Sequence, residues 1–280
     1  MKLTFKTWRY LSLGFLALAT VIRCLAFAFQ FDSDIGYFSR GAVLPIVSLV
    51  LLLAGLAVGV YAAIRYRKEV KCERLFRRLE WPSFAAMFAM IGYMFYMGYC
   101  FFFVQKKILW GILVLFSVLG VVFFLKSFFG RQSMQETTAW GFGLVIYEVL
   151  VIFLNYTEWT TTLNSPIKMT LQLAALAQML YFVTEFREML QIPRRGFHVF
   201  AAVLMAGLSA YFSLPEILTF MTGQAQHALY FFSGIVSLMM TCYGVTALLS
   251  FTVDGETGGE TTRNCEKEKE QETEDTQVQE

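Results

Sequence analysis

Eight long apolar segments run along this 280-residue chain, and they constrain its fold more than any other feature. Each is close to the roughly 20 residues that a helix needs to cross a bilayer core of about 30 Å. A backbone in lipid must satisfy its own hydrogen bonds, and the runs are continuous rather than alternating, which favours helices over β-barrel strands. The sequence therefore predicts an all-α fold, a polytopic integral membrane protein with a bundle of about eight transmembrane helices. The predicted spans are 10–31, 43–64, 83–104, 108–129, 138–156, 166–189, 197–213 and 226–251.

Lysine and arginine are distributed unevenly among the connecting segments. If the N-terminus is inside, the inner segments hold 18 of these residues. The outer loops then hold four, which are Arg40, Lys106, Lys107 and Lys168. Cytoplasmic loops of membrane proteins carry such an excess of positive charge. We therefore expect the N-terminus and the C-terminus to be cytoplasmic, in a protein of the plasma membrane.

The first segment allows one alternative. Lys2, Lys6 and Arg9 precede an apolar run, and Ala26-Phe27-Ala28 matches the small-residue pattern of a signal-peptide cleavage site. Cleavage there would leave seven helices and an outer N-terminus. The stretch around Ala28 is more apolar than a good cleavage region, so we expect the segment to remain as the first helix.

The composition separates a membrane domain from a tail. The chain is 57% hydrophobic and 16% charged, against about a quarter charged in soluble domains. From Phe251 onward it carries ten acidic and three basic residues and almost no aromatic side chains. We therefore predict a transmembrane domain over residues 1–251 and a disordered acidic cytoplasmic tail over 252–280. A role in binding nucleic acid has no support.

Two surface features suggest partners. The segment Arg65–Arg78 carries seven positive charges, which would suit anionic inner-leaflet lipids, although it could simply fix the topology. Small residues form faces that allow close helix approach, within one chain or between two. A second copy of the chain and a membrane partner subunit are therefore both candidates. These faces are Gly55, Gly59 and Ala63, and Ser233, Ser237, Thr241 and Gly244.

Two charged residues fall inside the predicted spans. Arg23 lies slightly to the outer side of the middle of its segment, and Glu148 lies near the middle of another. At 1.5 Å per residue their depths differ by about 5 Å, which a long arginine side chain can cover. An unpaired charge at such a depth costs several kcal/mol. The sequence thus predicts an Arg23–Glu148 pair, with a functional role or a structural one; the alternative is an arginine that reaches outward to the interface.

Polar residues also follow one face of the sixth predicted helix. Ala174, Gln178, Tyr181, Glu185 and Glu188 are spaced by four, three, four and three positions. We expect this face to point into the bundle, with Glu185 and Glu188 near enough to the surface to be solvated. Arg23, Glu148, Gln178 and Tyr181 together form the candidate intramembrane binding site.

A shorter signal follows the seventh span. Ser213-Leu-Pro-Glu216 matches a capping box with proline in the first helical turn. It predicts that the span ends at residue 213 and that a short helix begins on the outer surface.

Three classes of function remain open. The chain has no H-E-x-x-H motif, no P-loop, no complete G-x-G-x-x-G and no C-x-x-C pair, so we expect no cofactor, no metal and no catalytic residue. A transporter or permease-like protein for a small molecule or ion would use the candidate site. A sensory, regulatory or assembly subunit without catalytic activity would act through its loops and tail, and fits equally well. A membrane enzyme is the third class. A wet cavity reaching Glu148 would favour the transporter.

Overall fold

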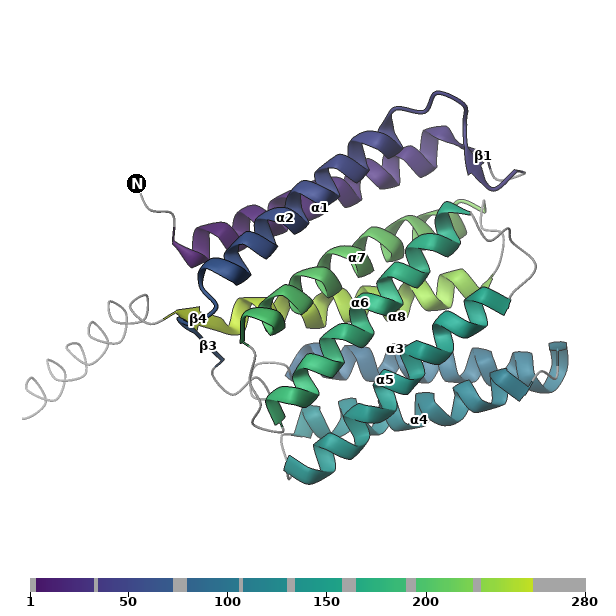
Figure 1. Ribbon diagram of the computed structural model, residues 1–280. Helices are drawn as coiled ribbons and strands as arrows, with labels where there is room; N and C mark the ends of the chain where they lie inside the picture. Colours follow the sequence, from purple (N-terminus) through teal and green to yellow (C-terminus); the bar gives the residue numbers. More distant parts are fainter. Residues whose placement is uncertain are drawn as a thin grey trace, which may run out of the picture.

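The computed structural model describes residues 4–32, 35–72, 80–105, 108–129, 134–157, 165–189, 195–223 and 228–253 (Figure 1). Within these ranges lie α1 (Phe5–Gln30), α2 (Leu44–Arg65), α3 (Glu80–Tyr99), α4 (Ile108–Phe129), α5 (Met134–Thr157), α6 (Pro166–Met189), α7 (Arg195–Met221) and α8 (Ala228–Ser250). Among the described residues, these eight helices are all long and apolar enough to cross a membrane. The chain is thus a multi-pass membrane protein, and the predicted class of fold is confirmed.

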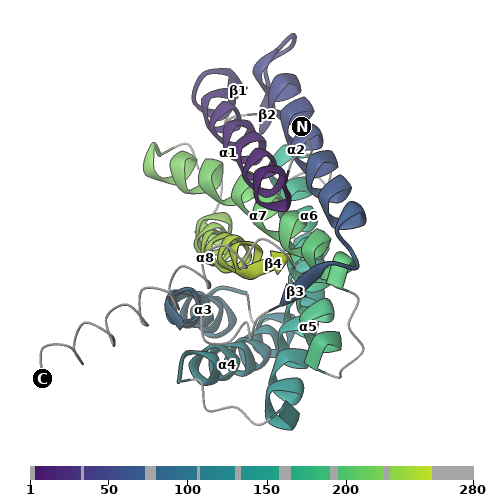
Figure 2. The ribbon, with the colours of Figure 1, turned by 90° about the vertical axis from the view of Figure 1, so that its left-hand side faces the viewer.

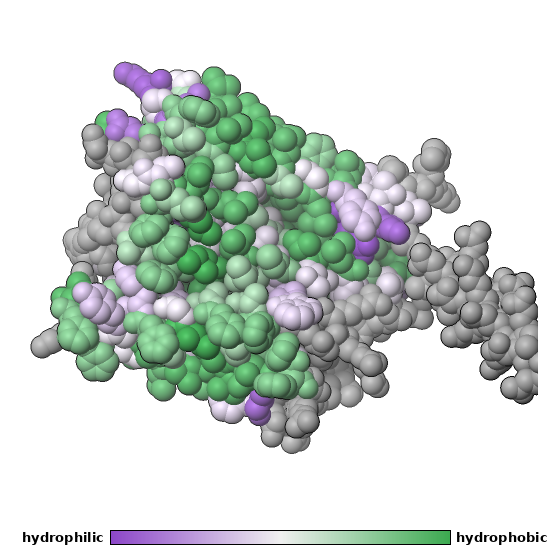
Figure 3. Space-filling model, turned by 180° about the vertical axis from the view of Figure 1, so that it is seen from behind, coloured by the Kyte–Doolittle hydropathy of each residue, from purple (hydrophilic) through white to green (hydrophobic). Residues whose placement is uncertain are grey.

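The outer surface of the bundle is apolar over most of its area. Figure 3 shows hydrophobic residues across the face that lies behind the view of Figure 1. Large side chains such as Phe29, Phe103 and Ile108 are more than three-quarters exposed. Soluble monomers rarely expose contiguous apolar patches of more than a few hundred Å². A lipid bilayer solvates such a surface, so these side chains mark the faces that contact lipid.

Six of the helices enclose an interior and the other two pack outside it. Contacts run from α3 to α4, α5, α6, α7 and α8 in order, and α8 returns to α3. This six-helix ring is flattened, because α6 also contacts α8 across it. The hairpin α1–α2 packs against α7 on the outside of the ring, as the view in Figure 2 shows. Helix α7 therefore joins the ring to the hairpin.

Small residues allow the hairpin to approach α7 closely. A Cβ atom added at Gly59 would lie 2.5 Å from Val203 Cγ1 on α7 and 3.0 Å from Ser12 Oγ on α1. One added at Gly55 would lie 3.0 Å from Leu16 on α1. The small-residue face of α2 thus serves contacts within the chain, which decides one question that the sequence left open.

Two short antiparallel ribbons occur outside the helices, although the sequence predicted none. Strand β1 (Phe31–Asp32) pairs with β2 (Tyr37–Phe38) in the α1–α2 connection. Strand β3 (Val70–Cys72) pairs with β4 (Phe251–Val253), so the segment after α2 is joined to the segment after α8. The Arg9 guanidinium, on α1, supports this junction by donating to the carbonyl oxygens of Leu248, Leu249 and Phe251 at 3.3, 3.2 and 3.0 Å.

The seventh helix is longer than predicted. Helix α7 continues through Pro215 to Met221, so the predicted end at residue 213 and the separate surface helix are wrong. Membrane helices tolerate proline because neighbouring groups can satisfy the backbone carbonyl that proline leaves unpaired. The Ser213 hydroxyl does not cap a new helix but donates to the carbonyl oxygen of Ala210 at 3.4 Å. Glu216 consequently lies inside the bundle, where it is 3% exposed.

The start of α1 and the end of α8 lie at the same end of the bundle (Figure 1). The β3–β4 ribbon lies at this end as well, which we call the ribbon end. The β1–β2 ribbon lies at the other end. An even number of spans requires this arrangement. Of the basic segment Arg65–Arg78, residues 73–78 lie outside the described residues, as does the predicted tail beyond Val253.

Strand β4 yields a prediction about where the folded domain ends. A chain truncated after Val253 should keep the stability of the full chain. A chain truncated after Ser250 loses β4 and with it the buried side chains of Phe251 and Val253. Burying one large apolar side chain is worth about 1.5–3 kcal/mol. We expect a clearly lower melting temperature in detergent for the chain that ends at Ser250, and not for the chain that ends at Val253. Equal melting temperatures of the two truncated chains would show that β4 contributes nothing to stability.

Candidate functional site

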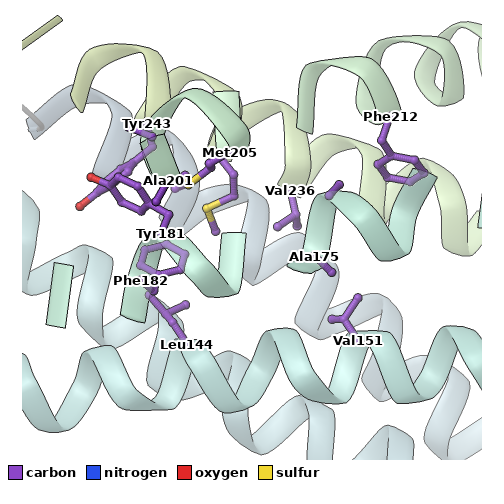
Figure 4. Close-up of a cluster of buried hydrophobic side chains, with 14 of the residues drawn as sticks. Leu144, Val151, Ala175, Tyr181, Phe182, Ala201, Met205, Phe212, Val236 and Tyr243 are labelled. Atoms are coloured by element: carbon purple, nitrogen blue, oxygen red, sulfur yellow. The ribbon is translucent and has the colours of Figure 1, made fainter. Parts of the chain in front are cut away.

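A small cavity lies inside the six-helix ring, between α5, α6 and α8. Its lining includes Glu148, Gln178 and Ser237. The volume that the centre of a water molecule can occupy is about 10 Å³, enough for about one water molecule. Figure 4 shows three of its apolar lining residues, Val151, Ala175 and Val236, extending from α5, α6 and α8. The full lining is Tyr147, Glu148, Val151, Leu171, Ala175, Gln178, Ser233, Val236 and Ser237.

Glu148 is the ionisable group of this cavity. Its side chain is 1% exposed, and its Oε1 atom has no hydrogen-bond partner among the described residues. Two phenols interact with it electrostatically, those of Tyr147 and Tyr93, whose rings pack edge to face with centroids 6.0 Å apart. A buried carboxylate without a counter-charge is costly in a membrane interior and is usually functional. This oxygen is therefore the best candidate for contact with a ligand, an ion or a water molecule.

Gln178 connects three helices beside Glu148. Its Nε2 atom donates to the hydroxyl of Ser209 on α7 at 2.9 Å and to that of Ser237 on α8 at 3.2 Å. All three side chains are buried. An amide held in this way orients the polar groups of the cavity, and a shift of α6 relative to α7 or α8 would break these bonds. The hydrogen bonds of Gln178 in the cavity therefore depend on the packing of α6 against α7 and α8.

The predicted polar face of α6 does point into the bundle. Ala174, Gln178, Tyr181 and Glu185 are each at most 4% exposed, while the side chain of Glu188 lies outside the described residues. Tyr181 lies one turn from Gln178 toward the ribbon end. Its ring packs against those of Phe182, His198 and Tyr243, with centroid distances of 5.6, 5.3 and 5.9 Å. Tyr181 therefore belongs to a second, aromatic cluster rather than to the lining of the Glu148 cavity.

Arg23 does not pair with Glu148, so the predicted Arg23–Glu148 pair is wrong. The guanidinium donates to the carbonyl oxygen of Pro166 and to the hydroxyl of Thr170, both at 3.3 Å. Its carbon also lies 4.2 Å from the centre of the Tyr211 ring. Helix α1 is outside the ring, so its arginine meets α6 and α7 near the β1–β2 end. These contacts stabilise a cation that would otherwise be isolated in the bilayer, although its Nε atom has no hydrogen-bond partner among the described residues.

Arg23 interacts electrostatically first with the phenol of Tyr211 and then, through space, with the carboxyl group of Glu216. Glu216 was not among the predicted site residues because the predicted seventh span ended at residue 213. The one signal that could have revealed it is the continued apolar pattern of residues 214–221 on both sides of Glu216. Within the described residues, no three His, Cys, Asp or Glu side chains gather closely enough to hold a metal ion.

The fold and the buried polar groups define the chain as a multi-pass α-helical membrane protein with a polar interior. Comparison with protein-family models, with curated proteins and with solved structures gave no match. The assignment of a function therefore depends on the site itself.

Proposed function

We propose that this chain is a transporter or permease-like protein for a small molecule or ion, with its central site at Glu148 and Gln178. The observation that supports the proposal most directly is the unpartnered Oε1 atom of Glu148 in a cavity between α5, α6 and α8. A helix bundle needs no such group for its stability, since an apolar side chain would pack there at lower cost. Arg23 does not belong to the site at Glu148 and Gln178. Tyr181 lies one helical turn from Gln178 and does not line the cavity.

The orientation belongs to the proposal as well. The predicted inner segments hold eighteen basic residues and the outer loops four, which favours a cytoplasmic ribbon end in a plasma membrane. The basic segment Arg65–Arg78 would then face anionic inner-leaflet lipids. In the transporter that we propose, this small cavity would correspond to an occluded state of an alternating-access cycle.

The small volume of the cavity also favours a second candidate function. Space for about one water molecule is small for a substrate, and Gln178 ties α6, α7 and α8 together. A sensory, regulatory or assembly subunit, acting with a second copy or a partner subunit, would show this kind of packing. The two functions differ in a single physical respect, which is whether the cavity ever opens.

Cysteine labelling tests that difference without knowledge of the substrate. Ser237→Cys, in a chain whose five native cysteines are replaced, puts a thiol in the cavity lining. A transporter that alternates between two open states should allow a small impermeant thiol reagent to modify this position from either side of sealed vesicles. We expect the same from Ala175→Cys, which lines the cavity on α6.

Ser117→Cys is the matched control. Ser117 is fully buried on α4 and donates to the carbonyl oxygen of Leu113, but it does not line the cavity. This position should stay unmodified from both sides. Absence of labelling at positions 237 and 175 from both sides would overturn the transporter and leave the sensory or assembly role.

A further inference from the structure

Another buried carboxyl group, that of Glu185, lies on the same face of α6 as Gln178. It is closer to the ribbon end than Gln178. Glu185 is only one turn from the end of the helix at Met189, yet it is 4% exposed. The phenol of Tyr243, on α8, donates to Glu185 Oε1 at 3.0 Å. The other carboxylate oxygen, Oε2, has no hydrogen-bond partner among the described residues. The expected solvated glutamate is therefore a buried group with one oxygen available.

Aromatic side chains separate this carboxylate from the ribbon end. The imidazole of His198 packs against the ring of Tyr181 at 5.3 Å on one side and against that of Phe251 at 5.2 Å on the other. Phe251 is the first residue of β4 and is 1% exposed. The ribbon thus covers the cluster, and Figure 4 shows Tyr181 and Tyr243 with their hydroxyl groups at the same end of the buried cluster.

The charged surroundings of Glu185 are sparse. Tyr243 is the titratable group that interacts with it directly, and no basic side chain among the described residues compensates its charge. Tyr181 on α6 and His198 on α7 are the other titratable groups of the cluster, next to Tyr243 and Tyr181 respectively. An ionised carboxylate without a counter-charge is costly in such an environment, whereas its neutral acid form is tolerated.

We propose that Glu185 and Tyr243 form a proton-binding site that exchanges one proton with water at the ribbon end. The inference rests on the proposed function and deepens it, because it makes the proton the ion that moves with the substrate. Glu148 would then be the central site. Glu185 would bind the proton between that site and the water at the ribbon end.

The proton step conserves charge and atoms. A hydronium ion, or the acid form of a buffer, reaches Glu185 when the Phe251 cover opens. Its proton bonds to Oε2, so the carboxylate becomes a carboxylic acid and the donor becomes water or the conjugate base. Tyr243 keeps its own proton and donates to Oε1 throughout. On release the Oε2–H bond breaks and the proton returns to water.

Infrared difference spectroscopy of the full chain in lipid nanodiscs tests this site without any substrate. Between acidic and alkaline buffer, the wild type should show the C=O stretch of a protonated carboxylic acid that exchanges in heavy water. Glu185→Gln should remove this band and lower the proton uptake by about one proton per chain in a matched titration. Tyr243→Phe should keep the band and shift its frequency, because the acid then lacks its hydrogen-bond donor.

Two further variants separate this proposal from the proposed function. Glu148→Gln should leave the Glu185 band unchanged, and Phe251→Ala should speed its exchange in heavy water because the cover is smaller. A spectrum of Glu185→Gln identical to that of the wild type would overturn the inference. If that variant does not fold, an unshifted band in Tyr243→Phe overturns it equally. A Glu185 band in a protein whose position 237 resists labelling would refute transport but keep the proton site.

Discussion

Replacement of Arg23 by methionine should destabilise the protein strongly, and the loss should be coupled to Glu216 rather than to Glu148. Arg23→Met removes the buried cation–π contact with Tyr211, which is worth about 2 kcal/mol when the cation is desolvated, together with the hydrogen bonds to Pro166 and Thr170. It also removes the positive charge that interacts through space with the carboxyl group of Glu216, which is 3% exposed. Glu216→Gln should cost less, since the guanidinium keeps the Pro166 carbonyl, the Thr170 hydroxyl and the Tyr211 ring.

The measurement is the unfolding free energy in detergent or bicelles for a double-mutant cycle. Arg23→Met with Glu216→Gln should cost much less than the sum of the single losses. Arg23→Met with Glu148→Gln should be additive within about 0.3–0.5 kcal/mol, as is usual for groups that share no partner. Coupling of Arg23 to Glu148 in place of Glu216 would show that the arrangement of α1 against α7 described above is incorrect.

Gly59→Leu should separate the α1–α2 hairpin from the six-helix ring. Even a Cβ atom at this position would lie 2.5 Å from Val203 Cγ1, and a leucine adds three more carbon atoms. Insertion of extra methylene groups into a packed interior costs about 1–3 kcal/mol, and more where backbones have to move. We expect a large fall in melting temperature, together with faster proteolysis in the α2–α3 connection.

The chain offers a control for Gly59 in the same hairpin. A Cβ atom at Gly14, on α1, would meet no atom within 4 Å, so Gly14→Leu introduces the same residue without a clash. Glycine is also less favourable than alanine in a helix by about 0.8–1 kcal/mol, and leucine ranks close to alanine. Gly14→Leu should therefore be neutral or slightly stabilising. Equal melting of the Gly59 and Gly14 variants would mean that α2 does not contact α7 closely.

The spans could be predicted because each depends on local sequence. The predicted ranges 108–129 and 166–189 coincide with α4 and α6, since continuous apolar runs between loops leave little freedom in lipid. The inward face of α6 followed from the helical period alone. Pro215 misled the prediction of α7, because proline ends helices in water more often than it does inside a bundle.

The partners of the buried charges could not be predicted in the same way. Position along a span gives the depth of Arg23 and Glu148 but not the side of the bundle on which each lies. Their similar depth was the reason for predicting a pair. Because α1 lies outside the ring, Arg23 instead contacts residues of α6 and α7. Glu185 was expected in water because the sequence does not show that Tyr243 donates to it, or that Phe251 from the far end of the chain packs against His198 in the neighbouring aromatic cluster.

The β3–β4 ribbon also imposes an order on biosynthesis. Strand β3 leaves the ribosome after the second of eight helices, whereas β4 follows the last. Strand β3 therefore cannot pair with β4 until the whole membrane domain has been synthesised. The ring can therefore assemble helix by helix with its ribbon end uncovered, and the Glu185 cluster is enclosed only when translation has passed Val253.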